Sequence, residues 1–185
     1  MGQYLSKKLR RLIRINGERT LGYDYRATHT NLAYCNSQLQ LEGDPYSIPG
    51  YARETVKRVM MRCFNVSSPA RAIQAVSAHW EKDKTGRLRY KDGLPRETAV
   101  DLVRVIGERH PKISNWIFKN CGLELMYQDA HIAKDVIMHF VNQGIPCLSI
   151  HDCFIVPKRY ADELRQVMLD TWQKVTGFTV ELKRE

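Results

Sequence analysis

The segment Leu148-Ser149-Ile150-His151-Asp152-Cys153-Phe154-Ile155-Val156-Pro157 places an ionisable pair, His151 and Asp152, in a run otherwise apolar enough to form a buried strand. Removing a carboxylate from water is costly unless it is paired, hydrogen-bonded or bound to a cation. An aspartate on a core strand therefore usually has a binding or catalytic role. A metal ion is the partner that we expect for Asp152.

A second carboxylate, Asp24, has a similar setting. It belongs to residues 20–25, a strand-like segment rich in β-forming residues, which is followed by a polar break and a helical pattern at 31–34. One aspartate alone is a poor site for Mg2+, which typically takes one or two carboxylates together with substrate phosphates. Two such strands, laid side by side, would bring both carboxylates to one edge of a sheet.

The composition is that of a globular protein with a basic surface. The 185 residues, 43% of them hydrophobic, suffice for one domain with its own core. The formal net charge is +9, from 29 Lys and Arg against 20 Asp and Glu. This balance favours an anionic partner, most commonly nucleic acid, although a basic surface can also serve solubility alone.

Cysteine usage and hydropathy indicate a soluble, cytoplasmic protein with no membrane partner. The five cysteines are scattered and form no C-x-x-C pair, so we expect reduced thiols rather than disulfides or a zinc site. The basic N-terminus lacks the apolar core of a signal peptide. No segment approaches the roughly 18 apolar residues of a membrane span.

Helical patterns dominate the middle of the chain. Ser68 and Pro69 read as the N-cap and first turn of a helix that runs through Trp80, ahead of a charged, mobile loop. The remaining helices are expected at 51–66, 95–109, 128–142 and 160–175, and a short helix after Pro111 carries Trp116 and Phe118. The charged loop is expected at 81–93, and a last strand at 178–182. The pattern predicts an α+β fold, with a small, mostly antiparallel sheet backed by helices.

The expected helix after Gly50 carries a stripe of three residues at the helical period, Arg53, Lys57 and Phe64. Two cations and an aromatic ring on one face meet the demands of a nucleotide, which are charge neutralisation for the phosphates and a stacking surface for the base. The alternative is a solvated basic face with Phe64 in the core.

Four segments, in this order along residues 20–170, resemble the motifs of the family A polymerase superfamily. Asp24-Tyr25 resembles its first metal-binding motif, and residues 53–61 resemble the fingers helix that grips the incoming triphosphate. Residues 150–157 resemble the second metal-binding motif, and their sequence is closest to that of the single-subunit phage and mitochondrial RNA polymerases. Residues 128–131 resemble the segment that precedes this motif in those polymerases. The resemblance implies one palm-like domain over 1–185 with fingers-like helices at about 51–143.

The resemblance also implies a minimal template-directed nucleotidyltransferase that extends RNA or DNA by two-metal-ion phosphoryl transfer. Asp24 and Asp152 would hold two Mg2+ or Mn2+ ions. Lys57 would donate a proton, and His151 would orient the primer terminus or support Asp152, unless it is a core histidine bonded to a backbone carbonyl. The nucleoside triphosphate would contact Arg53, Lys57, Phe64, Asn65, His29 and Tyr25, and the template and primer would contact Arg26, Gln128 and His131.

The chain also departs from the family pattern. Asn65-Val66 stands where the RNA polymerases have Tyr-Gly, and His29 stands where the DNA polymerases have a glutamate that excludes ribose, so both sugars remain open. We expect these 185 residues to leave no room for an exonuclease domain, a promoter-reading domain or a full thumb. We therefore expect low processivity, or dependence on a partner protein or on self-association. The basic residues Lys7, Lys8, Arg10 and Arg11 would hold backbone phosphates, or form a solvated arm.

Two other functions compete with this interpretation. The first is a catalytically inactive palm-like module that binds nucleic acid or serves as a replication accessory, which the two carboxylates disfavour because they repel phosphate. The second is a metal-dependent nuclease, which also needs paired acids but has no use for a helix that grips a triphosphate.

Overall fold

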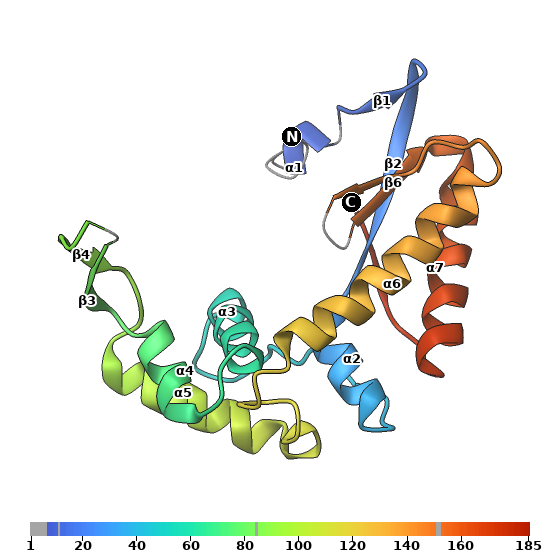
Figure 1. Cartoon of the computed structure of the whole chain (residues 1–185). Coiled ribbons are helices and arrows are strands. Elements are labelled where there is room, and N and C mark those ends of the chain that lie inside the picture. Colours follow the sequence, from blue (N-terminus) through green and yellow to red (C-terminus); the bar gives the residue numbers. More distant parts are fainter. Residues whose placement is uncertain (1–6, 11, 84, 151–152) are drawn as a thin grey trace. The chain divides into compact units, whose positions relative to one another are not determined.

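The computed structural model describes residues 7–10, 12–83, 85–150 and 153–185 (Figure 1). It combines helices with a curled antiparallel sheet and a small second sheet. The predicted α+β class is therefore confirmed. The chain divides into two compact units, which we call the sheet unit (Met1–Leu41 with Leu125–Glu185) and the helical unit (Glu42–Glu124).

The sheet unit contains the main sheet and the helices that accompany it. Its strands are β1 (Arg14–Ile15), β2 (Glu18–Tyr25), β5 (Leu148–Ile150), β6 (Cys153–Pro157) and β7 (Leu182–Arg184). Its helices are α1 (Lys7–Arg10), α2 (Thr28–Asn36), all but the first turn of α6 (Gly122–Val141), the 3-10 turn η3 (Lys158–Tyr160) and α7 (Ala161–Thr176).

Strand β2 is the centre of the main sheet. The strand order is β1-β2-β6-β5, with β7 also paired to β2, and every pairing within this sheet is antiparallel. The connection from β1 to β2 is Asn16-Gly17, and both residues have positive φ angles, of 52° and 78°. This two-residue turn suits the twist of an antiparallel hairpin, so the chain enters β2 in a defined register.

The apolar run at 148–157 forms two strands rather than the single strand that we expected. Strands β5 and β6 pair antiparallel, with Leu148 opposite Ile155 and Ile150 opposite Cys153. An apolar run can be buried either as one long strand or as two short ones. Its composition therefore does not distinguish the two arrangements. Residues 151 and 152 lie outside the described part of the chain.

The core of the sheet unit forms between the sheet and α7. Trp172 of α7 is buried against Tyr25 of β2, with ring centroids 5.1 Å apart, and Tyr25 meets Phe154 of β6 edge to face at 6.2 Å. Helix α7 is tied to α6 by a contact of 2.8 Å between His139 Nε2 and Glu163 Oε1. The strand ends that carry candidate residues are thus part of a packed layer (Figure 1).

The helical unit packs α3 (Arg53–Phe64), α4 (Pro69–Val76) and α5 (Arg96–Arg109) against one another. The prediction of Ser68 as an N-cap is confirmed, because its Oγ accepts a hydrogen bond from the Arg71 backbone N–H at 3.3 Å. The buried face of α3 contains Val56, Val59, Met60, Cys63 and Phe64.

The segment that we expected to be a mobile charged loop contains a β-hairpin. Strands β3 (His79–Lys82) and β4 (Leu88–Lys91) pair antiparallel, and Trp80, expected at a helix end, lies in β3 opposite Tyr90. Helix α4 stops at Val76. The alternation of apolar and charged residues in two four-residue strands is too short to stand out against the surrounding charge.

Three further element boundaries were wrong. After Pro111 the chain forms only the 3-10 turn η2 (Pro111–Ile113), since Phe118 has a φ angle of 59° that a helix does not allow. Helix α6 begins at Gly122, six residues before its predicted start at 128. The last strand is Leu182–Arg184, not 178–182.

Fingers-like helices were predicted at about 51–143. The helical unit spans Glu42–Glu124, and most of α6 belongs to the sheet unit. Within the described part of the chain, no helix is both long enough and apolar enough to cross a bilayer.

Candidate functional site

Asp24 lies near the end of the central strand β2. Its Cα pairs with Cys153 of β6 on one side and with Lys183 of β7 on the other. Side chains of directly opposed residues lie on the same face of a sheet, so Cys153 and Lys183 share the face of Asp24. The carboxylate is half-buried and its Oδ1 atom is buried. Sequence reasoning missed Lys183, because its strand was predicted to end at Leu182.

The second predicted carboxylate, Asp152, and its neighbour His151 lie outside the described residues. Asp152 directly precedes Cys153 in the sequence, and Cys153 is the strand partner of Asp24. Among the described residues, no three His, Cys, Asp or Glu side chains are grouped closely enough to hold a metal ion. Asp24 is thus the described member of the predicted pair, and the pair itself stays a prediction.

Gly22 explains why β2 and β6 approach so closely beside Asp24. A Cβ atom built on Gly22 would lie 2.8 Å from the Phe154 carbonyl oxygen and 3.0 Å from Ile155 Cγ1. Real Cβ atoms essentially never lie as close as 2.8 Å to another atom. Glycine at this position therefore sets the spacing of the two strands that carry the candidate carboxylates.

Tyr25 was predicted to contact nucleotide, but it is a core residue. Its ring is buried against Trp172, and its hydroxyl donates a hydrogen bond of 2.8 Å to the Met168 carbonyl of α7. Burial, and then the negative charge of Asp129, raises the pKa of the Tyr25 hydroxyl above its usual range. A ring held in this way is not available to a ligand.

Arg26 and His29 follow Asp24 along the chain and make contacts within the sheet unit. The exposed guanidinium of Arg26 forms an ion pair with Glu181, and its backbone N–H donates to the Glu181 carbonyl at 3.0 Å. The half-buried His29 has its Nε2 3.9 Å from Asp129 Oδ2 of α6. His29 belongs to α2, and this contact joins α2 to α6.

Two further predicted residues lie on α6. Gln128 Oε1 accepts a hydrogen bond of 2.9 Å from Asn36 Nδ2, so this residue joins α6 to the end of α2. His131 is exposed and packs against Tyr127, with ring centroids 4.2 Å apart. Tyr127 is itself exposed and was missed by sequence reasoning, although its spacing of four residues from His131 places both on one face of a helix.

In the helical unit, the predicted stripe on α3 is only partly available for binding. Phe64 is fully buried in the core, so it cannot stack on a base, and the alternative considered for it is correct. Arg53 is held by Asp44, with Nε 2.6 Å from Oδ2, and lies over the Tyr46 ring at 5.2 Å. Lys57 is exposed, and no ion pair involves it within the described part of the chain.

An open groove runs along α3 beside Lys57. It has a volume of about 340 Å³ and is lined by Glu54, Lys57, Arg58, Met61, Arg62 and Asn65. Three of its lining residues are cations and one is an acid, so the groove suits a polyanion. Sequence reasoning did not single out Arg58 and Arg62, although these two residues are four positions apart and therefore share one face of the helix.

Asn65 ends α3 at the edge of this groove. Its Nδ2 donates to the Met61 carbonyl at 2.7 Å, and a Cβ atom on Gly122 would lie 2.0 Å from its Oδ1. The glycine therefore makes room for the Asn65 amide. Asn65 is exposed and follows the last residue of α3, the helix that was predicted to grip a triphosphate.

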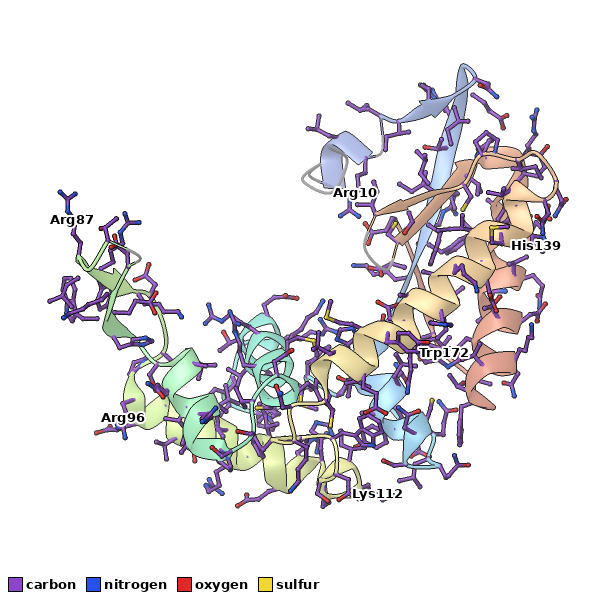
Figure 2. The ribbon with its side chains drawn as sticks, in the orientation of Figure 1. Arg10, Arg87, Arg96, Lys112, His139 and Trp172 are labelled. Carbon is purple, nitrogen blue, oxygen red and sulfur yellow. The ribbon has the colours of Figure 1, made fainter. Side chains whose placement is uncertain are left out.

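The basic N-terminus is described in part. Arg10 of α1, labelled in Figure 2, is half-buried. Together with Gly22, Cys153 and Glu185 it lines a cavity of about 60 Å³. Lys7 and Lys8 belong to α1, but their side chains are not among those described, and Arg11 lies outside the described residues. The prediction that these four residues bind phosphate therefore stays open.

All five cysteines are free thiols, as the scattered spacing indicated. Burial raises the pKa of the Cys63 and Cys147 thiols to about 12, so both are neutral near pH 7. Neutral, buried thiols are poor nucleophiles and poor metal ligands.

A scan against protein-family models finds none that matches the chain, and a search of curated proteins finds no significant match.

Proposed function

We propose that this protein is a template-directed nucleotidyltransferase that extends a nucleic-acid primer by phosphoryl transfer from nucleoside triphosphates. The observation that carries the proposal is the register of β2 and β6, in which Asp24 pairs with Cys153, the sequence neighbour of Asp152. The half-buried Asp24 on a central strand suits a cation, because a carboxylate in that setting needs positive charge.

Asp24 and Asp152 are the residues that would hold two Mg2+ or Mn2+ ions. When bound, such ions stabilise the charge on the attacking 3′-hydroxyl and on the leaving pyrophosphate. On the β7 side of Asp24, Lys183 adds a positive charge to the same sheet face.

The α3 groove supports the second half of the proposal, which is triphosphate binding. Lys57, Arg58 and Arg62 line it, and the exposed Lys57 is the residue that we assign as proton donor to the leaving phosphate oxygen. Arg53 is no longer assigned to the triphosphate, because Asp44 already binds its guanidinium. The basic balance of the whole chain agrees with a polyanionic substrate.

A catalytically inactive nucleic-acid-binding module is the second candidate. It is favoured by the burial of Phe64 and the Arg53–Asp44 pair, which remove two residues from the predicted nucleotide site. The cationic α3 groove would serve such a module equally well, because nonspecific binding to phosphates needs only accessible cations.

Primer extension tests the proposal. Purified protein is incubated with a labelled primer–template, Mg2+ or Mn2+, and either ribo- or deoxyribonucleoside triphosphates. We expect extension that falls to background in Asp24→Asn and in Asp152→Asn. The control is Asp162→Asn, which removes an exposed carboxylate from the first turn of α7 and should extend normally.

The same assay separates the competing functions. Cleavage of the labelled strand in place of extension would identify a nuclease. Binding of the primer–template with neither reaction would identify the inactive module. The pair of substrates also reads out the sugar preference that Asn65 and His29 leave open.

A further inference from the structure

The β3–β4 hairpin of the helical unit exposes an aromatic pair. Trp80 and Tyr90 are 65% and 55% exposed, although aromatic side chains of this size are usually buried. They are direct partners across the two strands, and their ring centroids lie 5.5 Å apart in an edge-to-face arrangement. The hairpin therefore presents two large ring surfaces to solvent.

The face with the aromatic pair also carries positive charge. Residues two positions apart on a strand share a face, so Lys82 and Leu88 lie on the face of Trp80 and Tyr90. Arg87 directly precedes β4 and, by the same alternation, belongs to the opposite face together with Arg89. Figure 2 shows its side chain extending outward from the end of the hairpin. Within the described part of the chain, neither Lys82 nor Arg87 takes part in an ion pair.

The opposite face of the hairpin carries ion pairs between residues of the hairpin itself. Arg89 Nε lies 2.8 Å from Asp83 Oδ2, and Lys91 Nζ lies 3.5 Å from Glu81 Oε2. Asp83 also orders the turn, because its Oδ1 accepts hydrogen bonds from the backbone N–H groups of Thr85 and Arg87. Arg89 and Lys91 are thus neutralised by acids, whereas Lys82 on the aromatic face and Arg87 at the end of the hairpin take part in no ion pair among the described residues.

The base of the hairpin is fixed to the helices on either side. Leu94 bridges to Ser77, and hydrogen bonds of 2.8 and 2.9 Å join Leu94 to Val76 and Ala78. A Cβ atom on Gly93 would lie 2.4 Å from the Ser77 backbone, so only glycine allows this close crossing. The aromatic pair is therefore held on a preformed arm rather than on a loop.

We propose that this hairpin, which we call the stacking arm (residues 79–91), binds single-stranded nucleic acid. An unpaired base would stack on Trp80 or Tyr90, and the neighbouring phosphates would contact Lys82 and Arg87. The bases of a duplex already have both faces covered, so a stacking surface selects a single strand. The inference extends the proposed function to a strand-binding element, but it rests on the hairpin alone and needs neither metal ions nor nucleotides.

Charge favours nucleic acid over a protein as the occupant. Residues 79–92 contain five Lys and Arg against three Asp and Glu, and the exposed face has no acid among Trp80, Lys82, Leu88 and Tyr90. Aromatic rings beside available cations form the combination that single-strand-binding surfaces use. An apolar protein partner would gain from the ring area but not from Lys82 and Arg87.

Fluorescence anisotropy of a labelled 15-nucleotide oligothymidylate tests the inference, at low salt and without divalent ions. We expect the double variant Trp80→Leu with Tyr90→Leu to weaken binding by at least about tenfold, since stacking on each base is a substantial part of the affinity. The matched Trp80→Phe with Tyr90→Phe variant keeps two rings and should bind nearly as the wild type does. Leu88→Ala, on the same face, should also leave binding unchanged.

A duplex of the same length provides the second comparison. Its affinity should not change in the double leucine variant, because a duplex offers no free base face. Equal affinity of the wild type and the double leucine variant for the single strand would overturn the inference. An equal loss of affinity for the single strand and the duplex would also overturn it. A third contrary result is a double leucine variant that keeps its affinity while Lys82→Ala and Arg87→Ala lose theirs, because that result would indicate phosphate contacts alone.

The test is independent of the catalytic proposal. Asp24→Asn should bind the single strand as the wild type does, whether or not the wild type extends a primer. Loss of primer extension with intact single-strand binding would therefore count against the proposed function and leave the stacking arm in place. Circular dichroism of each variant checks that the fold is retained.

Discussion

Asp24 and Cys153 face each other across strands β2 and β6, next to the one glycine of β2. The pairing joins two parts of the chain separated by more than a hundred residues. It brings Asp24 of the first predicted motif against Cys153, the residue that follows the second predicted aspartate. The two distant motifs are thereby related by a definite strand register, which mutation can test.

The register depends on Gly22. We expect Gly22→Ala to destabilise the protein by about 1–3 kcal/mol, because the new methyl group meets the Phe154 carbonyl at 2.8 Å. The loss is measured by chemical denaturation, and primer extension should fall as the two strands separate. Gly107→Ala in α5 is the matched control, since its nearest neighbour would lie at 3.7 Å. That change should stabilise its helix by about 0.5–1 kcal/mol, and equal effects of the two substitutions would contradict the argument.

Lys57 and Arg53 should differ in their effect on triphosphate binding. We expect Lys57→Ala to weaken the binding of a fluorescent nucleoside triphosphate about tenfold, because it removes a charge-assisted contact in the α3 groove. Arg53→Ala should change the affinity little, since its guanidinium is bound to Asp44, and it should cost less than about 1 kcal/mol of stability at this exposed site. A larger loss of affinity in Arg53→Ala would restore the original assignment.

Tyr25 should behave as a core residue. Tyr25→Phe removes the hydrogen bond to the Met168 carbonyl and should destabilise the protein by about 1 kcal/mol, with no effect on nucleotide affinity. Tyr25→Ala also removes the ring that packs on Trp172, and should cost about 3 kcal/mol or more. Thermal denaturation and nucleotide titration of the two variants check this. A drop in nucleotide affinity in a well-folded Tyr25→Phe protein would show that the hydroxyl contacts substrate.

His110 should make the stability of the helical unit depend on pH. It is buried and bonded through Nε2 to the Pro45 carbonyl at 3.1 Å, and burial lowers the pKa of its imidazole below the ordinary value of 6.5. The unfolded chain therefore takes up a proton near pH 6.5 that the folded chain does not. The contribution of His110 is complete above that pH, and declines as the pH falls toward the lowered pKa of the folded state.

Chemical denaturation between pH 5 and pH 8 measures this effect. His110→Gln keeps a donor for the Pro45 carbonyl but does not titrate, so its free energy of unfolding should decline less below about pH 6.5. His131→Gln, at an exposed site on α6, serves as the control. Identical pH profiles of the wild type and His110→Gln would refute the assignment.

Local signals in the sequence determined the class of fold and several of its elements. The N-cap at Ser68, the strand around Asp24 and the apolar period of α6 each depend on residues within a few positions of one another. Such short-range preferences act in any context, which is why they could be interpreted from the sequence. The thiols were likewise expected to be free, and they are.

Long-range packing decided the rest. The run at 148–157 forms two strands, of which β6 pairs with both β5 and β2. Phe64 and Tyr25 are buried in cores formed by distant segments. Arg53 is held by Asp44, an acid that no helical period links to it. Periodicity shows which residues share a face, whereas only the folded chain decides whether that face meets solvent, an acid or the core.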